Sequence, residues 1–425
     1  MNMKEMKFLP LALMMGVLTL TSCSSDDDNN TNNSQPTEEQ YKDRSYGNNA
    51  IDACSNVVNA LTSANNVIAT ANLTADQENY LRNVLTSLVG NVIVPTCTKL
   101  ADDVEDLEKT LNGLTVQTIT QAQIDKACAD FKQARLNWEQ SEAFLMGAAS
   151  DFDIDPTIDS WPLNRSLLLS YFNNGMSDEM LEDASILGFH ALEFILFRNG
   201  QNRKVAELQG NDTYTNFTAI SGAKELQYAQ TICTLLKQRC YQLQVAWQGE
   251  TTSNAARVAV LKAAKLDYTT EAGLSYGDNL TKAGISGSKS TFTSLKAAVA
   301  QVLSATEGSC VGIANEVGTA KIANPFSAGD IAYVESPYSY NSIADFADNL
   351  RSVRNVWYGS TNGSVASTSF ANFFEGVGTA TTVSEATLSA IQKISAMPAP
   401  FVKYCSVVWG KNFDDPNNWE STSGE

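Results

Sequence analysis

The sequence contains a single histidine, His190, and its neighbours restrict the chemistry that the chain can perform. It lies in the segment Gly-Phe-His-Ala-Leu-Glu at 188–193. A zinc protease of the HExxH type needs two histidines one helical turn apart, and a ferritin-like di-iron bundle needs a Glu-x-x-His pair from each of two helices. A metal or proton-transfer site in this chain must therefore combine one imidazole with carboxylates, hydroxyls or amides.

The spacing of His190 and Glu193 places both side chains on one face of a helix, about one turn apart. The flanking residues at 186–197 are almost all apolar, which predicts a buried helix. Burying a carboxylate beside an imidazole costs several kcal/mol unless the two groups pair or share a ligand. Gly188 costs about 1 kcal/mol inside a helix, so we expect another backbone or a ligand to approach it closely. The alternative is a buried His–Glu hydrogen bond that only fixes helix packing.

Helices must position these residues, because the chain shows no convincing strand pattern beyond short runs. Thr74 has the features of an N-cap, with Gln77 at the capping-box position, and Pro95 should interrupt or end the helix that follows. The expected helices cover residues 51–71, 75–94, 120–146, 177–197, 226–248, 255–265, 290–303, 310–322, 342–357, 368–374 and 383–394.

Two polar segments between these helices carry side chains of the kind that often serve function. Residues 151–164 hold four aspartates and two prolines, which predicts an ordered, non-helical loop with carboxylates. The alternative for this segment is a solvated acidic turn. Residues 321–340 combine aromatic, hydroxyl and acidic side chains in a connection too long to be a simple link.

The N-terminus predicts export and lipidation. Lys4 and Lys7 precede an apolar run at 9–20 that is too short to span a bilayer as a mature helix. The residues Leu-Thr-Ser-Cys at 20–23 resemble a bacterial lipobox, so we expect residues 1–22 to be a signal peptide and Cys23 to be lipidated. Residues 23–40 are polar and should form a flexible tether. Their acidic start resembles the surface-export signal of Bacteroidetes lipoproteins, with a plain spacer as the alternative.

Charge and cysteine content narrow the classes of partner. The net charge of −18 and the pI of about 4.5 argue against nucleic acid or anionic lipid and are compatible with cations. Of the eight cysteines, lipidated Cys23 leaves an odd number, so at least one is unpaired within a monomer. The spacings fit no CxxC or zinc-ribbon motif. Buried structural thiols and one to three disulfides both fit an exported chain.

Five sequence blocks together carry a family resemblance. The Gly-x-His-x-x-Glu motif at 188–193 carries it most directly. The other blocks are Ala-Arg-x-x-Trp-Glu-x-Ser-Glu-x-Phe at 134–144, Asp-Pro-x-Ile-Asp-Ser-Trp-Pro-Leu at 155–163, Val-Glu-Ser-Pro-Tyr-Ser at 334–339 and Asp-Phe-x-Asp-Asn-Leu-Arg-Ser-Val-x-Asn-Val-x-Tyr-Gly at 345–359. In this order, from about residue 41 to about residue 400, they resemble the imelysin family. The departure is at 284–287, where relatives often carry a longer Gly/Asn-rich pattern.

The resemblance implies an all-α protein of two helical-bundle domains, related by duplication and packed around a shared interface cleft near the motif. We place these domains at 41–250 and 251–425. Relatives are exported and associated with iron acquisition, and the family is also filed as a metallopeptidase group. A hydrolytic zinc usually has three protein ligands and a water, whereas an oxygen-rich site with one nitrogen suits iron better.

The leading hypothesis is a lipid-anchored binding protein of the outer membrane, on the cell surface or the periplasmic face, that serves iron uptake. It would bind iron or an iron chelate and could contact envelope transport components. The expected metal residues are His190, Glu193, Glu142 and Asp159, as ligands or as residues that orient ligands. The expected ligand-binding residues of the cleft are Ser160, Trp161, Glu335, Ser336, Asn349 and Arg351.

Arg351 is ambiguous, because a guanidinium in the site favours an anionic iron chelate whereas the same side chain could form a helix-surface or interdomain salt bridge. Two other functions remain open. One is a metallopeptidase that uses zinc at the HxxE motif. The other is a non-catalytic interaction lipoprotein in which the His–Glu pair is structural and no metal is bound.

Overall fold

Capping side chains and apolar stripes set the helix boundaries in the computed structural model, which describes residues 35–175, 181–375 and 379–418. The expected all-α class is confirmed, since the strands β1 and β2 form only a short antiparallel hairpin. The α-helices and strands up to residue 248 are α1 Glu38–Lys42, α2 Ser45–Thr70, α3 Ala75–Leu88, α4 Val94–Asn112, α5 Gln121–Glu139, α6 Ala148–Asp151, α7 Ile154–Ile158, α8 Arg165–Asn174, α9 Gly188–Leu196, β1 Phe197–Arg198, β2 Gln201–Asn202, α10 Val205–Gln209 and α11 Gly222–Gln248.

The remaining α-helices are α12 Ala255–Ala264, α13 Tyr276–Thr281, α14 Leu295–Ser304, α15 Cys310–Glu316, α16 Ser342–Tyr358, α17 Phe370–Glu375, α18 Ala380–Ser395 and α19 Phe401–Val408. Tighter or wider helical turns join them. These are the π-helices η1 Val89–Ile93 and η5 Val317–Ala328 and the 3-10 turns η2 Glu142–Phe144, η4 Ala184–Ile186, η6 Ile331–Tyr333 and η7 Pro416–Asn418.

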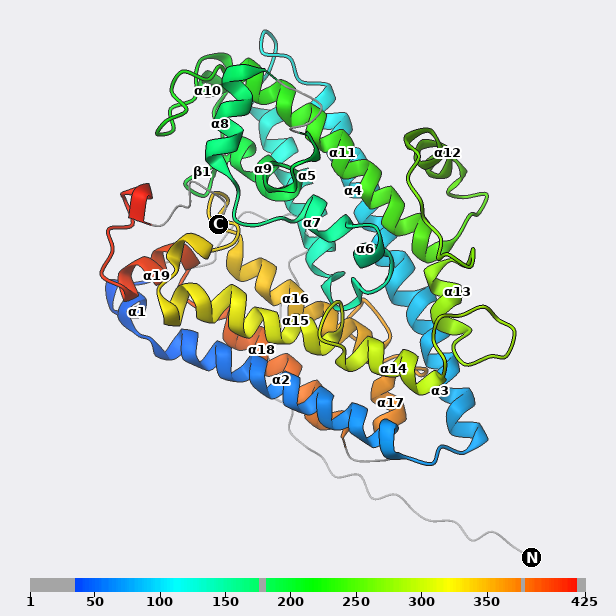
Figure 1. Ribbon diagram of the computed structural model, residues 1–425. Helices are drawn as coiled ribbons and strands as arrows, with labels where there is room; N and C mark the ends of the chain where they lie inside the picture. The colour runs from blue at the N-terminus through cyan, green and yellow to red at the C-terminus, as the bar shows by residue number, and fades with distance from the viewer. Residues whose placement is uncertain (1–34, 176–180, 376–378, 419–425) are drawn as a thin grey trace, which may run out of the picture. The chain divides into compact units, whose positions relative to one another are not determined.

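The helices pack in two groups that meet along α5 and α16 (Figure 1). In the first group α4 packs against α5 and α11, and α9 lies against α11 and α5. In the second group α2 packs against α18, α14, α15 and η5, and α16 packs against α18 and α15. The contact between α5 and α16 therefore brings polar side chains from the two groups face to face.

From Pro36 onward the described residues form one compact unit. Helix α2, the first long helix of this unit, packs with the helices after residue 290 rather than with α4 and α11. The boundary expected near residue 250, and the duplication, remain predictions. The expected signal peptide at 1–22, lipidated Cys23 and most of the tether lie outside the described residues, whereas residues 38–40 of the expected tether already belong to α1.

Pro95 does not end its helix, because a π-helical turn absorbs it. Thr74 caps α3 with the expected Gln77 capping box, and η1 then carries the chain into α4, with Pro95 in its first turn. Proline lacks a backbone N–H, so an uninterrupted α-helix would lose one hydrogen bond at Pro95. The π-helical turn just before it changes the hydrogen-bond pattern, so that this donor is not needed. In the described chain this continuous helix, Ala75–Asn112, is the one long and apolar enough to cross a membrane, but half of its apolar window is buried within the fold.

Several expected helices have different ends in the structure. The helix expected at 120–146 ends with α5 at Glu139, because η2 turns the chain immediately afterwards. The motif helix begins at Gly188 rather than at 177, and η4 precedes it; residues 176–180 lie outside the described part. The expected non-helical loop 151–164 contains α7, and much of the second polar segment lies in η5 and η6.

Disulfides, one of the two alternatives considered for the cysteines, are not formed. All seven cysteines from Cys54 to Cys405 are buried and free. Their positions on the apolar faces of helices make each one a small core residue.

Candidate functional site

His190 is positioned by the contact between the start of α9 and the end of α7. Gly188 begins α9 with a φ of +71°, and a Cβ atom there would lie 2.2 Å from the carbonyl oxygen of Ile158. Only glycine permits this conformation and this approach together. The expected close approach of another backbone at Gly188 is therefore confirmed. Asp159 directly follows Ile158, and His190 lies two residues after Gly188. The same contact therefore brings the Asp159 carboxylate next to the His190 imidazole.

Three carboxylates surround the His190 ring. Its Nε2 lies 3.1 Å from Oδ1 of Asp159 and 3.6 Å from Oε1 of Glu335, and its Nδ1 lies 3.4 Å from Oε2 of Glu193. The Trp161 ring covers it, with centroids 4.7 Å apart. Although Asp159 is close to Nε2, this nitrogen is fully buried and makes no hydrogen bond of acceptable geometry to any described residue. The imidazole therefore directs Nε2 towards the carboxylates without a hydrogen-bonded partner.

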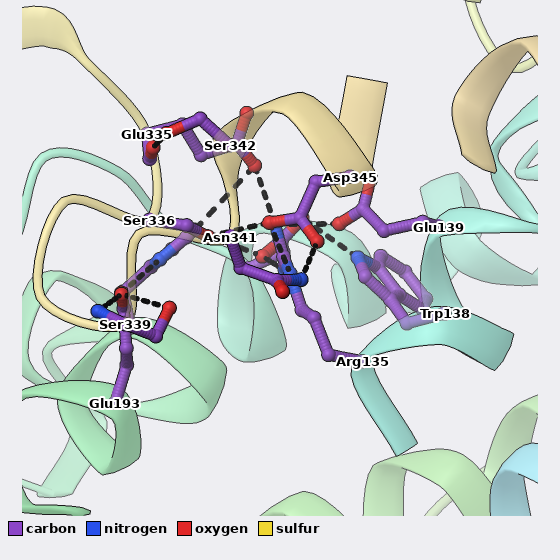
Figure 2. A network of polar contacts seen from close by, with 12 residues as sticks. Arg135, Trp138, Glu139, Glu193, Glu335, Ser336, Ser339, Asn341, Ser342 and Asp345 are labelled. Carbon is purple, nitrogen blue, oxygen red and sulfur yellow. Dashed lines mark hydrogen bonds and ion pairs between the residues drawn. The ribbon is translucent and has the colours of Figure 1, made fainter. Parts of the chain in front are cut away.

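Glu193 is held by the backbone of the segment that follows Glu335. Its Oε1 accepts hydrogen bonds from the N–H groups of Tyr338 and Ser339, at 3.0 and 2.7 Å, and from the Ser339 hydroxyl at 2.7 Å. The Glu193–Ser339 contact is visible in Figure 2. With one oxygen saturated in this way, Glu193 can orient Nδ1 of His190, as a carboxylate behind a metal-bound histidine commonly does.

The guanidinium of Arg135, on α5, lies at the centre of the cluster (Figure 2). It makes ion pairs with Asp159, with Glu139 at 2.5 Å and with Glu335 at 2.5 Å, and its Nε lies 3.5 Å from Asp345. These carboxylates come from α5, the end of α7, the segment before α16 and α16 itself. Arg135 thus joins the two helix groups at the point where they meet.

Lys321, on the π-helix η5, supplies a second buried cation. Its Nζ lies 2.9 Å from Oε2 of Glu335. Ser336 follows with a φ of +52° and donates its hydroxyl to Asp345 at 2.6 Å. A non-glycine residue in this conformation costs of the order of 1–3 kcal/mol and is often found at functional sites. The segment is therefore held in a strained form that keeps Glu335 directed at His190.

Two groups of side chains have ligand atoms close enough to hold one ion. Asp159, His190 and Glu335 form one group and Glu139, Glu142 and Asp159 form the other; in each group the ligand atoms lie within 4.8 Å of one another. One imidazole nitrogen with carboxylate oxygens suits a transition metal that accepts hard ligands, such as iron. The unpartnered Nε2 of His190 belongs to the first group, so this group fits a metal ion better.

The carboxylates of the cluster differ in charge state. Burial raises the pKa of Asp159 and Glu335, but Arg135, His190 and Lys321 lower it more, so both groups are held ionised. Burial raises the pKa of Glu139 and Glu142 well above the usual range, despite the attraction of nearby cations. The first candidate metal group therefore contains the anionic carboxylates, and the second contains groups that tend to be protonated.

His190 itself favours the imidazolium form in this environment. Burial and the charge of Arg135 lower its pKa, but Asp159, Glu193 and Glu335 together raise it well above the usual value. A metal ligand must be neutral imidazole, so metal binding has to displace this proton.

A cavity of about 240 Å³ leads to Asp159 and Glu335. Its wall also contains Glu142, Asp155 and Glu316, with Lys321 as the one basic residue among the described lining residues. Burial raises the pKa of Asp155 to about 7. Burial also raises the pKa of Glu316, so a cation that enters this cavity is favoured because it stabilises the ionised forms of these carboxyl groups.

Most of the residues expected from the sequence lie together. His190, Glu193, Asp159, Trp161 and Glu335 form the cluster, Ser160 lines the cavity and Ser336 bonds Asp345. Asn349 reaches the cluster through its amide hydrogen bond to Glu139. Glu142 lies at the edge, in the second candidate group and in the cavity wall.

Arg351 does not join them. Its guanidinium pairs with Asp348 at 2.9 Å, three residues earlier on α16, and the side chain is about a third exposed. This position matches the salt-bridge alternative. The cluster consequently lacks the arginine that would have favoured an anionic iron chelate.

The sequence alone did not assign roles to four charged residues of the cluster, among them the central Arg135. Arg135, Glu139, Lys321 and Asp345 all contact the cluster. The available signal was the i, i+4 spacing of Arg135 and Glu139 within a block that already carried the family resemblance. Asp345 opens the block at 345–359, but nothing in that block relates it to Arg135, and Lys321 lies in none of the five blocks. Only the fold brings η5 and α16 to α5.

An all-helical protein with one buried histidine among carboxylates is the class that these observations define. The Imelysin (Peptidase_M75) family model matches residues 93–415, more than half of the sequence, so the chain belongs to the imelysin family. It is 25% identical over 278 residues to iron-regulated protein A of Synechococcus elongatus; the match covers 65% of this chain and 64% of the relative.

The fold also resembles a solved structure. An iron-regulated protein A precursor from Parabacteroides distasonis superposes with a TM-score of 0.56 at 22% identity, covering 80% of this chain and 96% of the other. At this identity the likeness supports the fold alone.

Proposed function

We propose that this protein is a lipid-anchored binding protein of the bacterial cell envelope that takes up iron at the His190 cluster. Nε2 of His190 and the carboxylates of Asp159 and Glu335 would be the ligands, and Glu193 would orient the imidazole. The observation that carries the proposal is the convergence of these three ligand atoms within 4.8 Å around a buried nitrogen without a hydrogen-bond partner.

The charge balance supports a cation as the bound species. Once His190 is neutral, Arg135 and Lys321 face the ionised Asp159 and Glu335, with Glu139, Glu142 and Asp345 close by. Arg135 and Lys321 balance the two ionised carboxylates, whereas burial raises the pKa of Glu139 and Glu142; a bound metal ion would favour the ionised form of these two groups as well. The acidic cavity gives a cation a path to the same residues. The name of the relative from Synechococcus elongatus, which contains the words iron-regulated, is consistent with iron as that cation.

Binding is better supported than peptide hydrolysis. A metallopeptidase needs a free carboxylate as general base close to the metal-bound water. The carboxylates closest to the His190 ring already have partners: Glu193 accepts three hydrogen bonds, and Asp159 and Glu335 pair with Arg135. Burial raises the pKa of Glu142 well above its usual range, which favours its protonated form over that of a base.

The test is metal titration of the purified protein with Fe(II) under anaerobic conditions, and with Fe(III) and Zn(II). We expect one saturable iron site whose affinity falls by at least about 100-fold in His190→Ala and by about 10–100-fold in Glu193→Gln. Asp102→Asn is the matched control for Asp159→Asn, because Asp102 is exposed and pairs with Arg257 outside the cluster.

Iron binding that survives unchanged in both His190→Ala and Asp159→Asn would place the ion elsewhere and refute the proposal. Absence of iron binding to the unmodified protein would refute it as well. A circular dichroism spectrum identical to that of the unmodified protein would show that each variant is folded.

A further inference from the structure

A larger cavity, of about 1100 Å³, adjoins the one that leads to the cluster. The two share Glu142, Asp155, Pro156 and Glu316 in their walls, so these four residues lie between them. Cavities that bind small molecules usually measure about 300–1000 Å³. This space, which we call the chamber, therefore exceeds what a hydrated ion alone requires.

The chamber wall is acidic. It contains seven carboxylates, among them Asp153, Glu271 and Glu307, and no basic side chain among its described residues. Two cations outside the wall act on it: Arg239 attracts Asp153, and Nζ of Lys321 lies 3.9 Å from Oε1 of Glu316. A ligand with net positive charge would be favoured here and an anionic one repelled.

Aromatic rings form another part of the wall. Trp247, Tyr276 and Phe152 lie in a row, with centroids 6.3 Å apart for the first pair and 5.9 Å for the second. Aromatic faces attract organic ammonium groups through their quadrupoles. Tyr276 is fixed in this row by the hydrogen bond that its hydroxyl donates to Asp151 at 2.6 Å.

Trp247 supplies a second, independent indication of a ligand. The residue is 2% exposed, and its indole N–H has no hydrogen-bond partner among the described residues. A buried donor without an acceptor is costly, of the order of 1–3 kcal/mol. Because Trp247 lines the chamber, a ligand oxygen that reaches this nitrogen would satisfy it.

We propose that the chamber binds an organic molecule that carries a net positive charge and an oxygen acceptor. The proposal deepens the proposed iron site, because a cationic iron chelate in the chamber would deliver its metal to the adjoining cluster. The same chemistry also fits an organic cation without metal, and the test separates the two sources.

The probes are hydroxamates of different charge, measured by isothermal titration calorimetry at pH 7 and low salt. Ferrioxamine B carries a pendant ammonium group and a single positive charge, and its iron-free form keeps the ammonium. Ferrichrome is a neutral ferric hydroxamate, and the ferric complex of EDTA is an anion. We expect ferrioxamine B to bind at least about tenfold more tightly than ferrichrome, and the EDTA complex not to bind.

The iron-free form identifies the source. Equal affinity with and without iron would assign the chamber to organic cations in general, and binding of the ferric form alone would assign it to cationic chelates. The proposal is overturned if ferrioxamine B binds no more tightly than ferrichrome, or if neither cationic form binds.

Variants locate the binding in the chamber. Glu271→Gln with Glu307→Gln, both exposed at the wall, should weaken ferrioxamine B by about tenfold. Trp247→Phe should weaken it by about fivefold through loss of the N–H. Glu38→Gln with Glu39→Gln is the matched control, because it changes the net charge equally on exposed α1. Equal weakening in the control and in the wall variant would overturn the assignment.

His190→Ala separates this proposal from the iron site. We expect ferrioxamine B to bind this variant with unchanged affinity, while Fe(II) binding is lost. Loss of both would overturn the chamber as a distinct site, whereas retention of Fe(II) binding would count only against the proposed function.

Discussion

His190, Glu193 and Arg135 have different roles although their side chains share one cluster. His190 offers a nitrogen, Glu193 fixes the direction of the ring, and Arg135 compensates the carboxylates that would otherwise repel one another. Removing one partner from a buried ionic group usually costs about 3–5 kcal/mol. Substitution of Arg135 is therefore a poor test of binding, because it would damage the fold first.

The protonation of His190 gives a prediction at the residue scale. The structure raises its folded pKa well above the unfolded value of about 6.5. In metal-free protein, the 15N chemical shifts of the single histidine should therefore report imidazolium throughout pH 5–8. A titration midpoint at or below pH 6.5 would contradict this prediction. Saturating Fe(II) should abolish the imidazolium signal, because a paramagnetic ion bound to the ring broadens its resonances.

The sign of the linked stability change follows from the same shift. A raised folded pKa means that the folded state binds the proton more tightly, so the stabilisation from His190 is complete below about pH 6.5 and is lost as the pH rises through the folded pKa. Glu139 and Glu142, whose pKa values are also raised, act in the same direction. Asp159 and Glu335 act oppositely, and their contribution is lost only in more acidic solution.

The junction of α7 and α9 determines the site at the level of elements. Gly188→Ala would set a Cβ atom 2.2 Å from the Ile158 carbonyl, in a conformation with φ of +71°. We expect a loss of about 3 kcal/mol or more in the free energy of unfolding, measured with urea. Gly273→Ala is the matched control, since Gly273 has a φ of +80° with nothing within 4 Å, and should lose only about 1 kcal/mol. Equal losses would show that the approach to Ile158 is unimportant.

Much of the helical order was predictable from local signals. The capping box at Thr74 and the apolar runs of α2, α11 and α16 gave boundaries within a few residues. The predicted C-terminal end of α5 and the predicted start of α9 were wrong, because tertiary contacts determine them. The left-handed Gly188 starts a helix only where Ile158 lies against it, and no local pattern encodes that neighbour.

The site was also predictable only in part, because local composition marks some of its residues and tertiary contacts bring in the others. His190, Glu193 and Asp159 lie in segments with unusual composition, so sequence alone marked them. Lys321 was missed because it lies on a π-helix that the sequence indicated only as the end of an ordinary helix and a loop. Arg351 was misplaced into the site because its charge was visible and its partner, Asp348, was not weighed.

For the whole molecule, the free thiols give a prediction about maturation. Burial raises the pKa of Cys54 and of Cys128 to about 12, which suppresses the reactive thiolate. A thiol reagent should leave the native protein almost unmodified and should label all seven described cysteines once the protein is unfolded without reductant. Fewer than seven labelled sites among residues 54–405 would show that disulfides form. Mass spectrometry of the labelled peptides makes the count, with reduced unfolded protein as the control.

The two ends of the described chain are fastened to each other. Helix α1 packs against α19, the Tyr41 hydroxyl donates to the Ala399 carbonyl, and the Tyr404 hydroxyl donates to the Asp43 carbonyl at 2.5 Å. A force applied along the chain before α1 acts first on this contact between α1 and α19, which the two tyrosine hydrogen bonds help to hold. In turn α19 packs against η5, which carries Lys321, and against η6, which precedes Glu335. A force applied at the N-terminal end of the described chain would therefore be passed through α19 to two segments that support the cluster.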